Sequence, residues 1–129
     1  MRLGLYFALV VVSLAVTVCL RRGYRRWEVS GRSMVPALEP GDWLVVEPIR
    51  RGGRPLHTGD IVLARDPRES GRTLVKRVVR IEDGGFARLE GDNPAESTDS
   101  REFGPVAVDE IDARVRWRYW PLRRAGSVR

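Results

Sequence analysis

The chain has 129 residues, 31% of them charged, and a formal net charge of +6 at pH 7. This length allows one domain with a short appendage. The basic residues are spread from Arg2 to Arg129 instead of forming a stripe with aromatic side chains, which argues against nucleic acid as a partner. The single cysteine, Cys19, excludes an intrachain disulfide, and the single histidine, His57, is more typical of a loop residue than of a His-based catalytic triad. They also supply too few ligands for a zinc site, so no metal or cofactor is expected.

The first segment of the chain is an uncharged run over residues 3–20, rich in Val, Leu and Ala. At about 1.5 Å per residue a helix of this length reaches roughly 27 Å, enough to span the hydrocarbon core of a bilayer. A cleaved signal peptide is the main alternative, but the run ends in Val-Cys-Leu and Arg21-Arg22 instead of an Ala-x-Ala-like site. We therefore expect residues 1–26 to be a single-pass membrane anchor with a basic flank, so that the lipid bilayer is a partner.

The charges around this run bear on the side of the membrane that the rest of the chain occupies. Arginines follow the run at positions 21, 22, 25 and 26, whereas only Arg2 and the α-amino group precede it. The positive-inside rule then predicts a cytoplasmic C-terminal domain in a cell membrane. The family resemblance described below favours the opposite side, so the sequence leaves the side open.

Beyond the anchor, short apolar segments alternate with Gly, Pro and Asp. The segments are rich in Val, Ile, Leu and aromatic residues and predict strands at 27–29, 43–47, 61–65, 73–81, 86–90 and 111–120. Turns are predicted at 40–42, 51–55, 58–60 and 83–85, and no amphipathic helix competes with the strands. We expect an all-β, mostly antiparallel domain over residues 27–121, followed by a frayed basic tail over 122–129.

Lysine is almost absent from the chain. Of 23 basic residues, every one except Lys76 is an arginine. The pKa of lysine falls readily on burial, so lysine can act as a neutral base, whereas arginine stays charged. On a strand, Leu74 and Val78 would share the face of Lys76 and lower its pKa. The segment alone is equally compatible with a lysine at a strand edge whose amine reaches water.

A serine with a distinctive setting lies in residues 29–42. Ser33 stands between Gly31, which lets the backbone approach a ligand closely, and Pro36, which fixes φ. A serine nucleophile needs a base for its proton and donors for the oxyanion. With no histidine partner evident, Lys76 is the remaining candidate base, as in Ser/Lys variants of the catalytic triad. Taken alone, the stretch is also compatible with an ordinary loop.

A third stretch, residues 89–105, is dense in Asp, Asn, Ser and Gly. This composition is typical of a tight loop that hydrogen-bonds to itself. Within it Asp99 and Arg101 could pair, and Ser97 could orient a lysine amine. A calcium loop is the alternative, but the carboxylates lack the regular Asp-x-Asp-x-Asp-Gly spacing.

Together these segments resemble the bacterial signal peptidase I family over roughly residues 29–121. Ser33-Met34-x-Pro36 resembles the nucleophile motif of the family, Gly59-Asp60-Ile61-Val62 a structural strand motif, and Lys76-Arg77-Val78-Val79 the motif of the base. Gly91-Asp92-Asn93, followed by Ser97, Asp99, Ser100, Arg101 and Gly104, resembles the last motif. All four motifs occur in the order that the family shows.

The resemblance implies a signal-peptidase-like β-domain and a Ser/Lys dyad. Ser33 would be the nucleophile and Lys76 the general base. Ser97 would orient the lysine amine, and the Asp99–Arg101 pair would brace the loop.

It also implies how substrate is held. The backbone N–H of Ser33 would supply one oxyanion donor, while the serine hydroxyl that some relatives add corresponds here to Gly31. Met34 would line the pocket beside the nucleophile, and Met34 and Pro36 are the expected substrate-binding residues. Family members cut after small residues in an Ala-x-Ala pattern and bind the substrate as an added strand.

The segment after the base motif departs from the pattern of general signal peptidases and indicates which subgroup of the family the chain resembles. General signal peptidases follow the base motif with Gly-x-Pro-Gly-Asp, whereas residues 80–84 read Arg-Ile-Glu-Asp-Gly. Short members with this segment reduced and an ending like residues 118–121 resemble the maturation proteases of nickel-type superoxide dismutase. We therefore expect an anchored endopeptidase that removes the leader of a dedicated precursor, in preference to general signal peptides. The alternatives are an inactive, tethered peptide-binding module and a self-cleaving repressor-type Ser/Lys protease.

Overall fold

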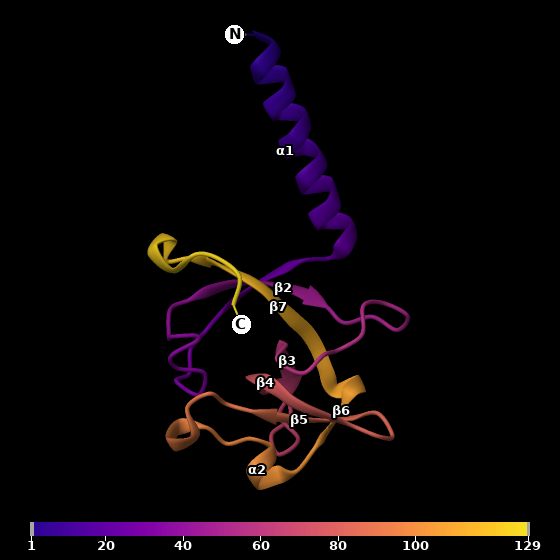
Figure 1. Cartoon of the computed structure of the whole chain (residues 1–129), viewed down its shortest axis with the longest axis vertical. Coiled ribbons are helices and arrows are strands. Elements are labelled where there is room, and N and C mark those ends of the chain that lie inside the picture. Colours follow the sequence, from indigo (N-terminus) through magenta and orange to yellow (C-terminus); the bar gives the residue numbers. More distant parts are fainter. Residues whose placement is uncertain (1, 129) are drawn as a thin grey trace.

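A computed structural model describes residues 2–128. Its helix α1 (Arg2–Arg22) projects away from the β-domain (Figure 1). The helix is long and apolar enough to cross a membrane, and its apolar window is not buried inside the protein. It ends at Gly23, whose φ of +70° is typical of a helix C-terminus. The Gly23 N–H donates to the carbonyl of Leu20 at 3.2 Å, and that of Tyr24 to Cys19 at 3.3 Å.

The domain is built on one seven-stranded antiparallel sheet with the order β1-β2-β7-β3-β4-β5-β6. The strands are β1 (Arg25–Glu28), β2 (Trp43–Pro48), β3 (Ile61–Arg65), β4 (Thr73–Glu82), β5 (Phe86–Glu90), β6 (Val106–Ala107) and β7 (Ile111–Trp120). The prediction of a mostly antiparallel β-fold with one N-terminal apolar helix is confirmed.

The sequence missed the shortest elements. β6 has two residues, too few for a period of two to appear in the sequence. The short helix α2 (Ser100–Phe103) is capped by Asp99, whose side chain accepts a hydrogen bond from the backbone N–H of Arg101. Single turns of 3-10 helix are η1 (Pro94–Glu96), η2 (Val108–Glu110) and η3 (Leu122–Arg124).

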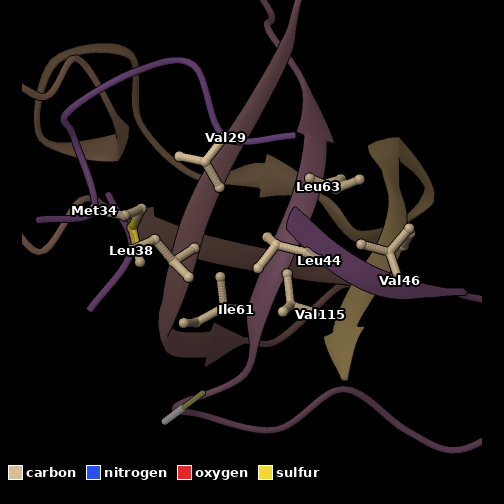
Figure 2. Close-up of a cluster of buried hydrophobic side chains, with 9 residues drawn as sticks. Val29, Met34, Leu38, Leu44, Val46, Ile61, Leu63 and Val115 are labelled. Carbon is tan, nitrogen blue, oxygen red and sulfur yellow. The ribbon is translucent and has the colours of Figure 1, made fainter. Parts of the chain in front are cut away.

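The core consists of two apolar clusters that share β3. Ile61 and Leu63 enter the first cluster, and Val62 and Ala64 the second, because successive strand residues point to opposite faces. Figure 2 shows side chains of the first cluster converging from β2, β3, β7 and the connection from β1 to β2, among them Val29, Met34, Leu38, Leu44, Val46 and Val115. Met34 and Leu38 thus fix the segment that carries Ser33 to the sheet.

The C-terminal segment is not frayed, contrary to the prediction for residues 122–129, as far as it is described. Gly126 forms a β-bridge with Arg118, and Val128 packs against the first cluster. Arg124 donates to the carboxylate of Asp42 at 3.2 Å and to the carbonyl of Pro36 at 3.2 Å. The basic composition of this segment predicted a solvated tail, but Arg124 instead donates hydrogen bonds to the buried carboxylate of Asp42 and to the backbone.

Candidate active site

Lys76 lies in the middle of the sheet and is only 3% exposed. β4 pairs with β3 on one side and β5 on the other, and Lys76 stands opposite the buried Val62. Leu74 and Val78 are buried on the same face, as the alternation predicted. The interpretation of Lys76 as a lysine at a strand edge is therefore wrong.

The surroundings of Lys76 favour its neutral form. Burial lowers the pKa of the amine, because removing the ammonium from water is unfavourable. The negative charge of Asp99 acts in the opposite direction, while Arg101, Arg72 and Arg68 lower the pKa further. The net shift is downward, in the direction that a general base requires.

A chain of hydrogen bonds orients this amine. Lys76 Nζ donates to Ser97 Oγ at 3.0 Å, and Ser97 Oγ donates to Asp99 Oδ2 at 2.5 Å. Because an ionised carboxylate only accepts hydrogen bonds, the hydroxyl proton of Ser97 points to Asp99. The oxygen of Ser97 is then left to accept from Lys76, which fixes the direction of one N–H bond of the amine.

Asp99 is held as an anion although it is fully buried. Burial by itself would raise the pKa of its carboxyl, but hydrogen bonds from Arg101, Gly91 and Ser97 hold the pKa well below its usual range. Arg101 Nε and Nη2 donate at 2.9 and 2.5 Å, and the Gly91 N–H donates at 2.8 Å. Arg101 thus balances a charge that would otherwise favour protonated Lys76.

The loop over residues 91–99 is also bound to the segment that carries Ser33 by hydrogen bonds and an ion pair. The Asn93 N–H donates to the carbonyl of Ser33 at 2.9 Å, and its side-chain amide donates to the carbonyl of Arg32 at 3.1 Å. Arg32 forms an ion pair with Glu96 at 2.7 Å. Any side chain at Gly91 would collide with Ser97 Oγ and would come within 2.5 Å of the Ser33 carbonyl oxygen. Glycine at this position therefore allows the two segments to approach each other.

Ser33 and Lys76 line one cavity of about 220 Å³, with residues of the β1–β2 connection, the start of β4 and the loop after η1. The fold thus brings Ser33 and Lys76, which lie 43 positions apart in the sequence, to one site. Ser97 and Asp99 lie behind the lysine, on the path to Arg101.

Residues 2–82 match the family model described as signal peptidase, peptidase S26. The chain belongs to this family. A mitochondrial ATP-independent inner membrane protease subunit 1b of Arabidopsis thaliana is 33% identical over 99% of this chain and 88% of its own length. Mitochondrial inner membrane protease subunit 1 of Xenopus tropicalis is 33% identical, and that of Homo sapiens 32%, both over 78% of this chain and over 71% and 72% of their lengths. Family and relatives support a membrane-associated peptidase that acts on protein.

The other residues predicted near the active site of this S26 peptidase differ in whether they line the cavity. Met34 is buried and lines the cavity with Ser33. A Cβ atom built on Gly31 meets no heavy atom within 4 Å, so position 31 lies next to open space. Pro36 is exposed and does not line the cavity; its carbonyl accepts a hydrogen bond from Arg124.

Several residues at the site of this S26 peptidase had no predicted role. Arg72, Glu96 and Thr98 line the cavity, and Asn93 tethers the serine segment. The family motif pointed to Asn93 by position, but composition gave no indication of Arg72, which reaches the cavity only because the strands pair as they do.

The aspartates of the loop over residues 91–99 form ion pairs with arginines. Asp92 receives two hydrogen bonds from Arg77, at 2.8 and 2.6 Å, and Asp99 is paired with Arg101. Within residues 2–128 no group of three or more His, Cys, Asp or Glu side chains could hold a metal ion. These pairs do not fit the alternative of a calcium loop.

Proposed function

We propose that the chain is a membrane-anchored serine endopeptidase in which Ser33 and Lys76 form a catalytic dyad that removes an N-terminal leader peptide from a precursor protein. The observation that carries the proposal is the shared cavity of Ser33 and a buried lysine whose amine is oriented by Ser97. Membership in the signal peptidase family and the protease names of the relatives support the reaction class.

In this mechanism neutral Lys76 accepts the hydroxyl proton of Ser33 as Oγ attacks the carbonyl carbon of the scissile bond. The lysine ammonium then donates this proton to the leaving amine, so the C–N bond breaks and an acyl-enzyme ester on Ser33 remains. Lys76 next takes a proton from water, the resulting hydroxide attacks the ester, and the proton returns to Ser33 Oγ. Each cycle consumes one water and restores both side chains.

The oxyanion of both tetrahedral intermediates would be stabilised by the backbone N–H of Ser33. Gly31 carries no hydroxyl to add a second donor, and the space beside it is open. Stabilisation in this chain would therefore depend on backbone donors more than in relatives with a serine at this position.

For the substrate we propose a dedicated precursor, the leader-bearing form of a nickel-type superoxide dismutase, with Ala-x-Ala signal peptides of exported proteins as the alternative. Support comes from the connection between β4 and β5, where only residues 83–85 separate the strands. The reduced segment resembles the short maturation proteases, and the arginine flank of α1 suits a cytoplasmic precursor.

Cleavage of both precursors by the full chain, Ser33→Ala and Lys76→Arg tests the proposal. Both variants should lose about 10³-fold or more in kcat/KM, because arginine keeps the positive charge of Lys76 but cannot become neutral. Ser70→Ala, an exposed serine outside the cavity, should retain the wild-type rate.

The outcomes separate the alternatives. Unchanged cleavage in either dyad variant would refute the mechanism, and the better-cleaved precursor identifies the substrate class. A wild-type protein that binds the leader and cleaves neither precursor would support an inactive peptide-binding module.

A further inference from the structure

A second cavity, of about 180 Å³, lies where α1 meets the β-domain. It shares no residue with the cavity of Ser33. The end of α1, strand β2, the segment after β2 and one residue of β7 contribute its charged lining, namely Arg21, Arg22, Glu47, Arg50, Arg54 and Arg114.

Two of these charges are already compensated within the fold. Arg114 Nε lies 2.9 Å from the carboxylate of Asp60, and its Nη2 donates to the carbonyl of Pro55 at 2.6 Å. Glu47, the acidic residue of the lining, lies 3.7 Å from Arg116 Nε. These contacts hold the wall of the cavity in place and put a positive partner beside each of the two carboxylates.

The other arginines of the lining form no close ion pair, although the charge of Glu47 acts on Arg22 from a longer distance. Among residues 2–128, no carboxylate lies within 4.0 Å of the guanidinium groups at positions 21, 22, 50 and 54. Their positive charges converge on one concave surface, which raises the local concentration of anions. Arginine matches phosphate oxygens with paired N–H donors.

The C-terminal end of α1 would repel an anion if its last carbonyls were free. In the structure three of them accept hydrogen bonds: Arg50 Nη2 donates to the carbonyl of Arg22 at 3.3 Å, and the N–H groups of Gly23 and Tyr24 donate to the carbonyls of Leu20 and Cys19. A Cβ on Gly23 would lie 2.9 Å from Arg50 Nη2, so glycine lets this arginine close over the helix end. The cavity therefore remains electropositive.

The position of the cavity along α1 indicates the source of the anion. Arg21 and Arg22 directly follow the apolar run, and each helical residue advances about 1.5 Å. The headgroup region extends roughly 5–7 Å beyond each side of the hydrocarbon core, so a helix that spans the core places this cavity among lipid phosphates. We propose that the cavity binds the phosphate of an anionic phospholipid headgroup and thereby fixes the domain against the membrane surface.

The test uses the full chain purified in detergent with added phosphatidylglycerol or phosphatidylcholine, and native mass spectrometry counts the lipid retained. We expect preferential retention of phosphatidylglycerol. Arg50→Gln/Arg54→Gln should reduce it by about 5-fold per arginine, given the usual contribution of an arginine at an anionic surface. Arg54→Gln leaves the Arg50–Arg22 contact in place and should show a single-arginine loss, whereas Arg54→Lys should retain most of the binding.

Arg51→Gln is the matched control, because Arg51 belongs to the same loop, is highly exposed and lies outside the cavity. It should retain phosphatidylglycerol like the wild type. Equal retention of the two lipids, or equal retention by Arg54→Gln and Arg51→Gln, would overturn the proposal. Displacement of the lipid by millimolar inorganic phosphate would assign the site to free phosphate and would also overturn it. None of these readouts depends on peptidase activity.

Discussion

At the scale of single residues, the charge state of Lys76 depends on the balance between Asp99 and Arg101. Asp99 alone would raise the pKa of the amine, and the adjacent guanidinium offsets this effect. Ser97 separates the carboxylate from the amine by two hydrogen bonds, so the carboxylate orients the amine without contacting it.

Removing the positive partner should therefore change the pH dependence of the proposed peptidase. In Arg101→Gln the pKa of Lys76 should rise, because one nearby positive charge is lost and the charge of Asp99 is no longer balanced. Activity requires neutral lysine and increases with pH through this pKa, so the acidic limb of the kcat/KM profile should move to higher pH. Arg88→Gln, on β5 and paired with Glu82, should leave the limb unchanged. An acidic limb that stays in place or moves to lower pH in Arg101→Gln would contradict this account.

At the scale of elements, the connection between β1 and β2 is held at both of its ends. Near Ser33 it is bound by Asn93, and near its exit by Asp42, which is 1% exposed. The carboxylate of Asp42 accepts from Arg118 at 3.1 Å and from Arg124 at 3.2 Å. A segment without regular structure thus receives its rigidity from the C-terminal part of the chain.

Arg124→Gln should destabilise the domain by about 1–3 kcal/mol, because a buried carboxylate loses a charged donor. The neighbouring Arg123 is exposed, and Arg123→Gln should change stability by less than about 0.5 kcal/mol. Denaturant unfolding of both variants in the full chain measures the difference. Equal effects at the two positions would show that the interaction with Asp42 contributes little.

The elements that the sequence predicted are those with local patterns. The alternation around Lys76 placed β4 and its buried face correctly, and the apolar run placed α1. The contact between Arg124 and Asp42 joins residues 82 positions apart and leaves no periodic trace, so the tail was predicted wrongly. For the same reason Ser97 and Asp99 were predicted through family motifs, whereas the hydrogen bond from Asn93 to Ser33 depends on tertiary structure that no local pattern shows.

At the scale of the whole molecule, the arginine flank predicts the side of the membrane. The basic residues in the last turn of α1, together with Arg25 and Arg26, should retain the β-domain in the cytoplasm. Alkaline phosphatase fused after Arg129 should then be inactive in a bacterial host, and a cytoplasmic fluorescent reporter at the same site should be active. Substitution of the flanking arginines at 25 and 26 by glutamine is the informative variant, since it should weaken this bias. Phosphatase activity in the unmodified fusion would place the domain outside the cytoplasm.

The near absence of lysine has a practical consequence for spectroscopy. Because Lys76 is the one lysine among 23 basic residues, a sample enriched in ¹³C-lysine carries a single side-chain amine reporter in the β-domain. Its ε-carbon resonance would follow protonation of the amine directly, free of overlap and without any substitution. The same signal would respond to leader peptide entering the neighbouring cavity, so one assigned resonance can follow both protonation and occupancy.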